Sequence, residues 1–197
     1  PILTEDECEP IIGDPVCFEY PGDGTLTLGV DQDICLGESA DLTFSYTGND
    51  SITVTYTDGT TNFTINNLRD GDVETVTPTT TTTYELVDAT NPAGCEVFLE
   101  GQATITVNTP PSFEIVDYEC NGQQQYQATI VITGGIPGTY TIDGNPVTNP
   151  SDTFVTIFYD NNTSQTLLLD DANECGPVEI NLQRNCSCPN EAGTMQP

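Results

Sequence analysis

The chain has 197 residues, of which 31 are acidic and two are basic, so its formal net charge is −29 at pH 7. A chain without a cationic surface cannot neutralise phosphates, which excludes nucleic acid as a partner and disfavours anionic membrane surfaces. Histidine and lysine are absent, so catalytic triads, Cys-His nucleophiles and Schiff bases are excluded, and we expect no enzymatic activity. No stretch approaches the roughly 20 apolar residues of a transmembrane helix, so we expect no membrane insertion.

The first half of the chain consists of short segments in which apolar and polar residues alternate, as they do in half-buried β-strands. Turn-forming residues bound each segment, and no segment has a helical stripe. Asp58-Gly59 is expected to form a tight hairpin turn, because this pair tolerates the positive φ of a type I′ turn. We expect strands at Gly24–Val30, Asp41–Tyr46, Ile52–Thr57, Asn62–Ile65, Glu74–Thr77, Thr82–Val87 and Gln102–Asn108.

The second half repeats this pattern, and Asp143-Gly144 is its matching turn. About seven short strands per domain, separated by turns, indicate an all-β fold of tandem immunoglobulin-like β-sandwich domains. The strands expected here are Phe113–Tyr118, Tyr126–Ile132, Thr139–Ile142, Phe154–Tyr159, Thr166–Leu169 and Val178–Leu182.

The eight cysteines follow the same repeat. Cys35 and Cys120 each precede an alternating strand, and Cys95 and Cys175 each end the turn before a return strand. Domains this small gain little stability from their cores, so disulfides and an oxidising, extracellular compartment are expected. The equivalent positions predict the pairs Cys35–Cys95 and Cys120–Cys175. Among the remaining cysteines we favour Cys8 with Cys17, and Cys186 and Cys188 stay unassigned.

The two ends of the chain look like parts of further domains. Glu7-Cys8-Glu9-Pro10 before Cys17 matches Glu174-Cys175-Gly176-Pro177 before Cys186, and Thr109-Pro110-Pro111-Ser112 reads as a semi-rigid linker. A closing strand without its own sandwich should be satisfied by a neighbouring domain or, through strand exchange, by another copy. The expected organisation is a domain tail at 1–21, sandwiches at 22–109 and 110–185, and entry to a following domain at 186–197.

Five strings carry a family resemblance: Ile34–Thr43, Ser51–Gly59, Thr77–Tyr84, Asn91–Cys95 and Ala103–Asn108. Together they resemble the Ig-like/PKD-like tandem repeats of giant Bacteroidota cell-surface proteins, which include gliding adhesins and other type IX-secreted proteins. The resemblance implies an exported stalk, adhesin or appendage module and brings no catalytic motif with it.

One acidic loop is a candidate calcium site. Asp70, Asp72 and Glu74 alternate around a turn, and calcium takes six to eight oxygen ligands, so carbonyls and water would have to complete the shell. The alternative is a solvated Asp/Asn turn. Calcium is the one cofactor that the sequence suggests.

We therefore expect a structural segment of a long, secreted bacterial surface protein that forms a stalk, filament or appendage. Its partners would be neighbouring domains of the same protein and, after strand exchange, further copies in a homo-oligomer. Two alternatives remain open. One is an adhesive module whose end loops bind glycan or protein on a target-cell surface, and the other is an accessory β domain of a secreted hydrolase. Each places the chain outside the cell.

Overall fold

The computed structural model describes residues 24–94, 96–122, 124–148 and 151–186. All of the regular elements in these ranges are β-strands, and no described helix could cross a membrane. Contacts divide the described residues into two units. The first unit comprises the residues up to Ile34 together with Glu38–Thr106, and the second comprises Cys35–Gly37 together with the residues from Val107 onwards. The sequence placed the domain boundary after residue 109, and these domain bounds stay a prediction.

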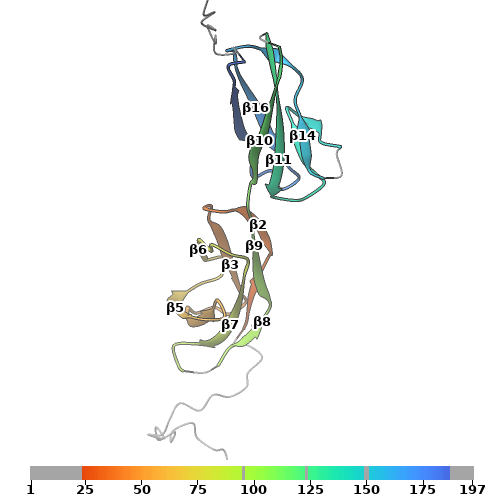
Figure 1. Ribbon diagram of the computed structural model, residues 1–197. Helices are drawn as coiled ribbons and strands as arrows, with labels where there is room; N and C mark the ends of the chain where they lie inside the picture. The colour runs from red at the N-terminus through yellow and green to blue at the C-terminus, as the bar shows by residue number, and fades with distance from the viewer. Residues whose placement is uncertain (1–23, 95, 123, 149–150, 187–197) are drawn as a thin grey trace, which may run out of the picture. The chain divides into compact units, whose positions relative to one another are not determined.

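Two sheets form the first unit (Figure 1). One has the strand order β6-β3-β1-β8, in which β1 pairs with β3 antiparallel and with β8 parallel, and the other has the order β2-β9-β7-β4-β5. The strands are β1 (Thr25–Gly29), β2 (Gln32–Cys35), β3 (Ala40–Tyr46), β4 (Ile52–Thr57), β5 (Asn62–Leu68), β6 (Val73–Val76), β7 (Thr82–Thr90), β8 (Phe98–Glu100) and β9 (Gln102–Asn108).

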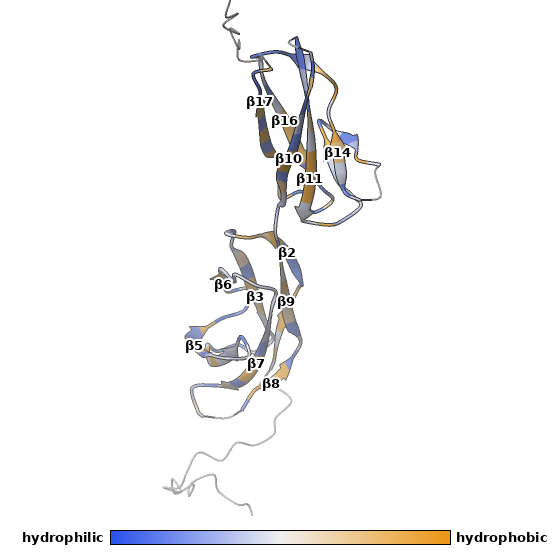
Figure 2. Ribbon diagram, in the orientation of Figure 1, coloured by the Kyte–Doolittle hydropathy of each residue, from blue (hydrophilic) through white to orange (hydrophobic). Residues whose placement is uncertain are grey.

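Alternation along these strands builds the first core. Every second residue of β3 from Ala40 to Tyr46 is buried, and the residues between them are exposed. Figure 2 shows hydrophobic and hydrophilic bands along the strands. The Phe44 ring of one sheet lies 6.0 Å from the Tyr56 ring of the other, centroid to centroid. Full burial of such a side chain stabilises by about 1.5–3 kcal/mol, so the period-two pattern is what holds the two sheets together.

The second unit is also a two-sheet sandwich. Its sheets have the orders β10-β11-β14, with β15 also paired to β11, and β13-β12-β16-β17. The strands are β10 (Pro111–Asn121), β11 (Gln125–Gly134), β12 (Thr141–Ile142), β13 (Asn145–Pro146), β14 (Thr153–Val155), β15 (Tyr159–Asp160), β16 (Ser164–Asp170) and β17 (Val178–Gln183).

Its core joins buried residues of β11, such as Ile130, to residues of the facing sheet, such as Leu169 and Ile180. Tyr126 is fully buried in this core, where its hydroxyl donates to the carbonyls of Thr163 at 2.9 Å and Leu182 at 3.2 Å. The predicted all-β architecture is confirmed.

The two predicted hairpin turns have different outcomes. Asp143 and Gly144 both have positive φ, 49° and 75°, and connect the paired residues Ile142 and Asn145, as a type I′ turn requires. In the other turn only Gly59 has positive φ, and the backbone N–H of Asp58 donates to the Thr61 carbonyl at 3.3 Å. The type I′ prediction at Asp58-Gly59 is therefore wrong, because this hairpin loop is longer than two residues.

Both predicted disulfide pairings are wrong. The described bridges are Cys35–Cys175, with a Cα–Cα distance of 5.5 Å, and Cys120–Cys186, with 5.7 Å. Cys120 lies near the end of β10 and Cys186 follows β17, so this bridge ties the first and last strands of the second unit. Equivalent positions in two repeats therefore did not identify partners.

The first pairing failed for a local reason. Cys35 ends β2, and Cys35–Gly37 belongs to the second unit, where the Leu36 N–H donates to the Asn108 carbonyl at 2.8 Å. The Cys35 sulfur is therefore within bonding reach of the Cys175 sulfur. The other cysteines, Cys8, Cys17, Cys95 and Cys188, lie outside the described residues, as do the predicted domain tail at 1–21 and residues 187–197.

Candidate functional site

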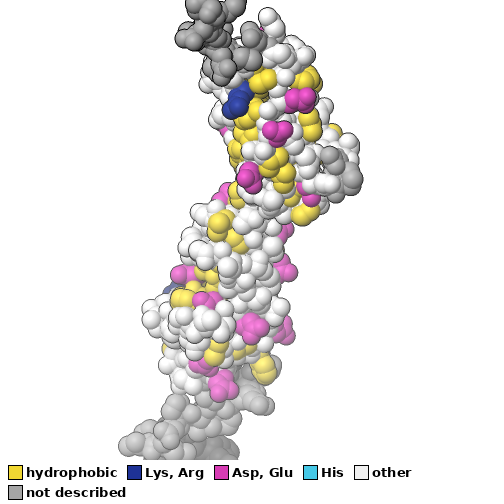
Figure 3. All heavy atoms as spheres, viewed as in Figure 1, with side chains coloured by type: hydrophobic (Ala, Val, Ile, Leu, Met, Phe, Trp, Pro, Cys, Tyr) yellow, Lys and Arg dark blue, Asp and Glu magenta, His cyan; other side chains and the backbone are white. Residues whose placement is uncertain are grey.

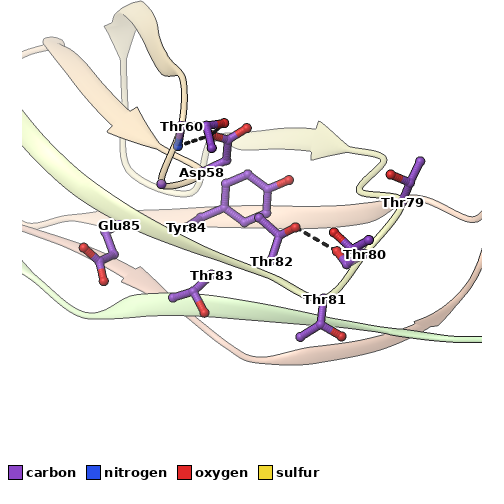
Figure 4. A pocket seen from close by; sticks show the side chains of 10 residues that line it. Asp58, Thr60, Thr79, Thr80, Thr81, Thr82, Thr83, Tyr84 and Glu85 are labelled. Atoms are coloured by element: carbon purple, nitrogen blue, oxygen red, sulfur yellow. Dashed lines mark hydrogen bonds between the residues drawn. The ribbon is translucent and has the colours of Figure 1, made fainter.

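A polar groove of about 550 Å³ opens on the first unit (Figure 4). The turn at Asp58–Thr60 forms one side, and the run from Thr79 to Glu85, which leads into β7, forms the other. Tyr84 lies beneath the turn and is 5 % exposed. Threonine hydroxyls dominate the lining, so the groove offers mainly hydrogen-bonding groups.

The carboxylate of Asp58 is committed to the turn itself. Its Oδ1 accepts from the Thr60 N–H at 2.8 Å, the Thr60 hydroxyl at 2.7 Å and the Thr61 N–H at 2.7 Å. These bonds, led by that from the Thr61 backbone, lower the pKa of the Asp58 carboxyl. Asp58 is therefore an ionised turn acceptor, unsuited to the role of a general acid. On the facing wall the Thr82 hydroxyl donates to the Thr80 carbonyl at 2.7 Å.

The candidate calcium loop is held together by hydrogen bonds. Asp70 Oδ1 accepts from the Tyr46 N–H at 2.9 Å and the Ser45 hydroxyl at 3.3 Å. Asp72 Oδ2 accepts from the backbone N–H of Arg69 at 2.7 Å, and the Asp72 carbonyl accepts from the Phe44 N–H at 3.0 Å. These bonds anchor the β5–β6 loop to β3, which gives two of the three carboxylates a structural role.

Glu74 lies apart from this network, on β6 opposite Leu42. Within the described ranges no three His, Cys, Asp or Glu side chains gather in an arrangement suited to a metal ion. The carboxylates are instead scattered over the surfaces of both units (Figure 3). Calcium at Asp70, Asp72 and Glu74 stays a prediction.

The second unit contains a buried carboxylate on the acidic turn that follows β16. Asp171 is 7 % exposed. Its Oδ2 accepts from the Ile136 N–H at 2.6 Å, and its Oδ1 accepts from the Asn173 N–H at 3.1 Å. The side chain thus ties the turn after β16 to the turn after β11. The local sequence Asp-Asp-Ala-Asn indicates a turn at Asp171, but it does not show that the side chain accepts a hydrogen bond from Ile136.

An adhesive role would be favoured by exposed aromatic residues gathered at one sandwich end. The second unit does hold three adjacent tyrosine rings, with Tyr126 6.0 Å from Tyr118 and 5.8 Å from Tyr159. However, Tyr126 is fully buried and the other two pack against the core. Arg184 lies over Tyr118, 5.5 Å from its centroid. These tyrosines therefore belong to the hydrophobic core and its border, where Arg184 makes a cation–π contact with Tyr118, and they do not form an exposed aromatic cluster.

No family model and no curated protein matches the chain. Its fold is similar to solved structures with tandem Ig domains. An N-terminal eight-Ig fragment of Down Syndrome Cell Adhesion Molecule is 14% identical, with a TM-score of 0.51 over 81% of this chain and 27% of that one. An ICAM-5 ectodomain fragment is 13% identical, with a TM-score of 0.49 over 84% of this chain and 47% of that one.

A three-Ig fragment of titin is 18% identical, with a TM-score of 0.45 over 80% of this chain and 61% of that one. The chain therefore spans less than two thirds of each of these three. At such identities the likeness concerns the fold alone, and the two units are tandem Ig-like β-sandwiches.

Proposed function

We propose that this chain is a structural module of a long extracellular protein, in which tandem sandwiches act as a spacer that resists extension. Its natural partners are then the neighbouring domains of the same polypeptide. The string resemblance described above supports a bacterial cell-surface stalk or appendage of the Bacteroidota type. The fold by itself does not define a role, since Ig-like sandwiches serve many functions.

The Cys35–Cys175 disulfide is the observation that carries the proposal. It joins positions 140 residues apart along the chain. Tension applied to the two ends of the chain passes through this bridge. The residues between Cys35 and Cys175, which include most strands of both sandwiches, therefore do not bear the force. Closing so long a loop also stabilises by about 4–5 kcal/mol in a chain-entropy estimate. A spacer built in this way stays short under load for as long as its environment remains oxidising.

The surface composition agrees with this role. An acidic surface keeps a chain soluble and opposes non-specific association. Because Arg69 and Arg184 are the only basic residues, proteases that cleave after lysine or arginine find two sites at most. Stretching single molecules with the disulfides intact and reduced tests the proposal, and broad glycosidase and esterase screens on the same protein test the rival hydrolase hypothesis.

A further inference from the structure

One sheet edge of the second unit differs in composition from the rest of the chain. Thr153–Tyr159 reads Thr-Phe-Val-Thr-Ile-Phe-Tyr. It contains no charge, Pro or Gly, and every residue in it is β-branched or aromatic, which is the composition that favours strand addition. β14 and Tyr159 of β15 lie in this segment, and among the described residues they pair with β11 alone, so the segment forms the outer edge of its sheet.

The hydrogen bonds show which backbone groups face outward. The Ile132 N–H donates to the Asp152 carbonyl at 2.9 Å, and the Thr156 N–H donates to the Ala128 carbonyl at 3.0 Å. In an antiparallel ladder alternate residues point their N–H and C=O groups to opposite sides. Residues 152, 154 and 156 therefore face β11, and residues 153, 155 and 157 face away from the sheet.

Side-chain exposure agrees with an open edge. Val155 is 50 % exposed and Ile157 is 72 % exposed, while Thr156 between them is 2 % exposed. The Ile157 carbonyl accepts from the Thr156 hydroxyl at 2.8 Å, and its second lone pair remains for another donor. Beyond Ile157 the edge carries one extra residue relative to β11, since the pair Val155–Thr129 is followed by Tyr159–Tyr126. This bulge limits regular pairing to Thr153–Ile157.

Most other described sheet edges carry protection against pairing. Edge strands β2, β6, β8, β10 and β17 each contain at least one acidic residue, and β13 contains Pro146. β5 is uncharged, but its register shifts, Asn67 has a φ of 60°, and its Phe63 stacks on Tyr56 at 5.1 Å. Charges, prolines and irregular backbone are the usual means of keeping an edge single. Thr153–Ile157 contains no charge and no proline, and its backbone irregularities, the positive φ of Asp152 (49°) and the bulge, lie at its two ends.

We propose that this edge pairs antiparallel with the same edge of a second copy of this chain. With the two-fold axis at Val155, Thr153 lies opposite the second copy's residue 157, and Val155 lies opposite residue 155. Outward-facing residues then meet outward-facing residues throughout, so the donors and acceptors of the two edges match without any shift. An isologous contact of this kind is self-complementary by symmetry.

Self-complementarity identifies the second copy as the occupant, because the outward-facing groups of this edge match those of an identical edge without any shift. A chain of net charge −29 is repelled by its own copies, and this uncharged edge is where two copies approach with least repulsion. In this register Asp152 lies opposite residue 158, so no two carboxylates face one another directly. Five paired residues span only about 17 Å, and such a contact falls well below the roughly 1,200 Å² of a stable interface. Association is accordingly weak for one pair and is strengthened by repetition along an array.

Sedimentation equilibrium with a matched pair of variants tests this proposal. Val155→Glu places like charges opposite one another across the axis, whereas Val116→Glu adds the same charge on β10, at the other edge of the same sheet. The two valines are 50 % and 49 % exposed, so both variants should fold, which circular dichroism checks. We expect wild-type dimers at concentrations on the order of 100 μM to 1 mM, as for small transient interfaces. Val155→Glu should weaken association at least about tenfold, and Val116→Glu by less than about threefold. Ile157→Glu should behave like Val155→Glu.

Wild-type association should also strengthen as salt screens the net charge. A wild-type protein that stays monomeric throughout this range overturns the proposal. Equal losses in Val155→Glu and Val116→Glu would also overturn it, since they would place the contact elsewhere or reduce it to net charge. A monomeric wild type that binds a peptide of residues 11–20, with binding lost in Val155→Glu, would assign the edge to a donated strand instead of a second copy.

Discussion

Gly135 and Asp171 offer a sharp test of how the second unit is held together. Gly135 has a φ of 55°, and a Cβ built at this position would lie 2.0 Å from Asp171 Oδ2 and 3.0 Å from its carboxyl carbon. The same oxygen accepts the 2.6 Å hydrogen bond from the Ile136 N–H. Gly135→Ala therefore forces the Asp171 carboxylate out of a buried position, and the part-buried Ile136 N–H loses its partner.

Two terms set the size of the effect. A non-glycine residue in the left-handed region costs about 1–2 kcal/mol. Leaving a buried donor unsatisfied costs about 1–3 kcal/mol, and the part-buried Ile136 N–H should fall in the lower part of that range, at about 1–2 kcal/mol. We expect Gly135→Ala to destabilise the second unit by roughly 2–4 kcal/mol, which for a domain of this size corresponds to a fall of roughly 10–25 °C in its Tm.

Gly138→Ala is the matched control. Gly138 has a φ of 81°, and nothing lies within 4 Å of its added Cβ, so it should show the backbone term alone. Chemical denaturation of wild type, both single variants, Asp171→Ala and the double variant Gly135→Ala/Asp171→Ala gives the coupling between Gly135 and Asp171. In the Asp171→Ala background the alanine at 135 should cost about as much as the alanine at 138. The reasoning is refuted if Gly135→Ala is no more destabilising than Gly138→Ala in the wild-type background.

Three further outcomes follow from the structure. Burial, with a smaller contribution from Glu74, raises the pKa of Tyr56 to about 12, so between pH 10 and 12 this tyrosine ionises in the unfolded chain first and the free energy of unfolding falls. Thermal melts over this pH range should show a shallower fall of the Tm with pH for Tyr56→Phe than for wild type. The same dependence of Tm on pH in both proteins would contradict this. Replacing both Cys120 and Cys186 by serine opens a loop with a 66-residue separation and should lower the unfolding free energy of the second unit by about 2–4 kcal/mol, whereas denaturation curves that do not move would argue against the bridge. Calcium should raise the Tm more than sodium at matched ionic strength only if the β5–β6 loop binds it, and Asp70→Asn, which keeps the acceptor oxygen but removes the charge, should abolish that difference.

Period-two alternation predicted most of the strands, because burial on one face is written directly into the residues. β4 and β9 have the predicted bounds. β2 and β8 were missed, since strands of four and three residues show too few alternations to detect. The turn at Asp143-Gly144 was predictable from local φ preferences. The one at Asp58-Gly59 was not, because the Asp58 side chain closes a longer loop.

Pairings between distant residues could not be derived in the same way. The sequence repeat placed Cys95 and Cys175 at equivalent positions, yet a disulfide depends on which sulfurs the tertiary fold brings within reach. The contact between Asp171 and the Gly135–Ile136 turn was hidden for the same reason. The calcium prediction considered carboxylate spacing, and spacing does not show that backbone N–H groups of Arg69 and Tyr46 already occupy two of the carboxylates.

Single-molecule stretching measures the proposed spacer role most directly. With Cys35–Cys175 intact, the 140-residue separation is bypassed, and only the end segments extend under load. Reduction releases that chain, which at about 3.4 Å per residue lengthens the fully extended molecule by about 480 Å. The double variant Cys35→Ser/Cys175→Ser should already be longer than wild type without reductant. An extended length that is the same before and after reduction, or the same in variant and wild type, would contradict a disulfide-locked module that resists extension.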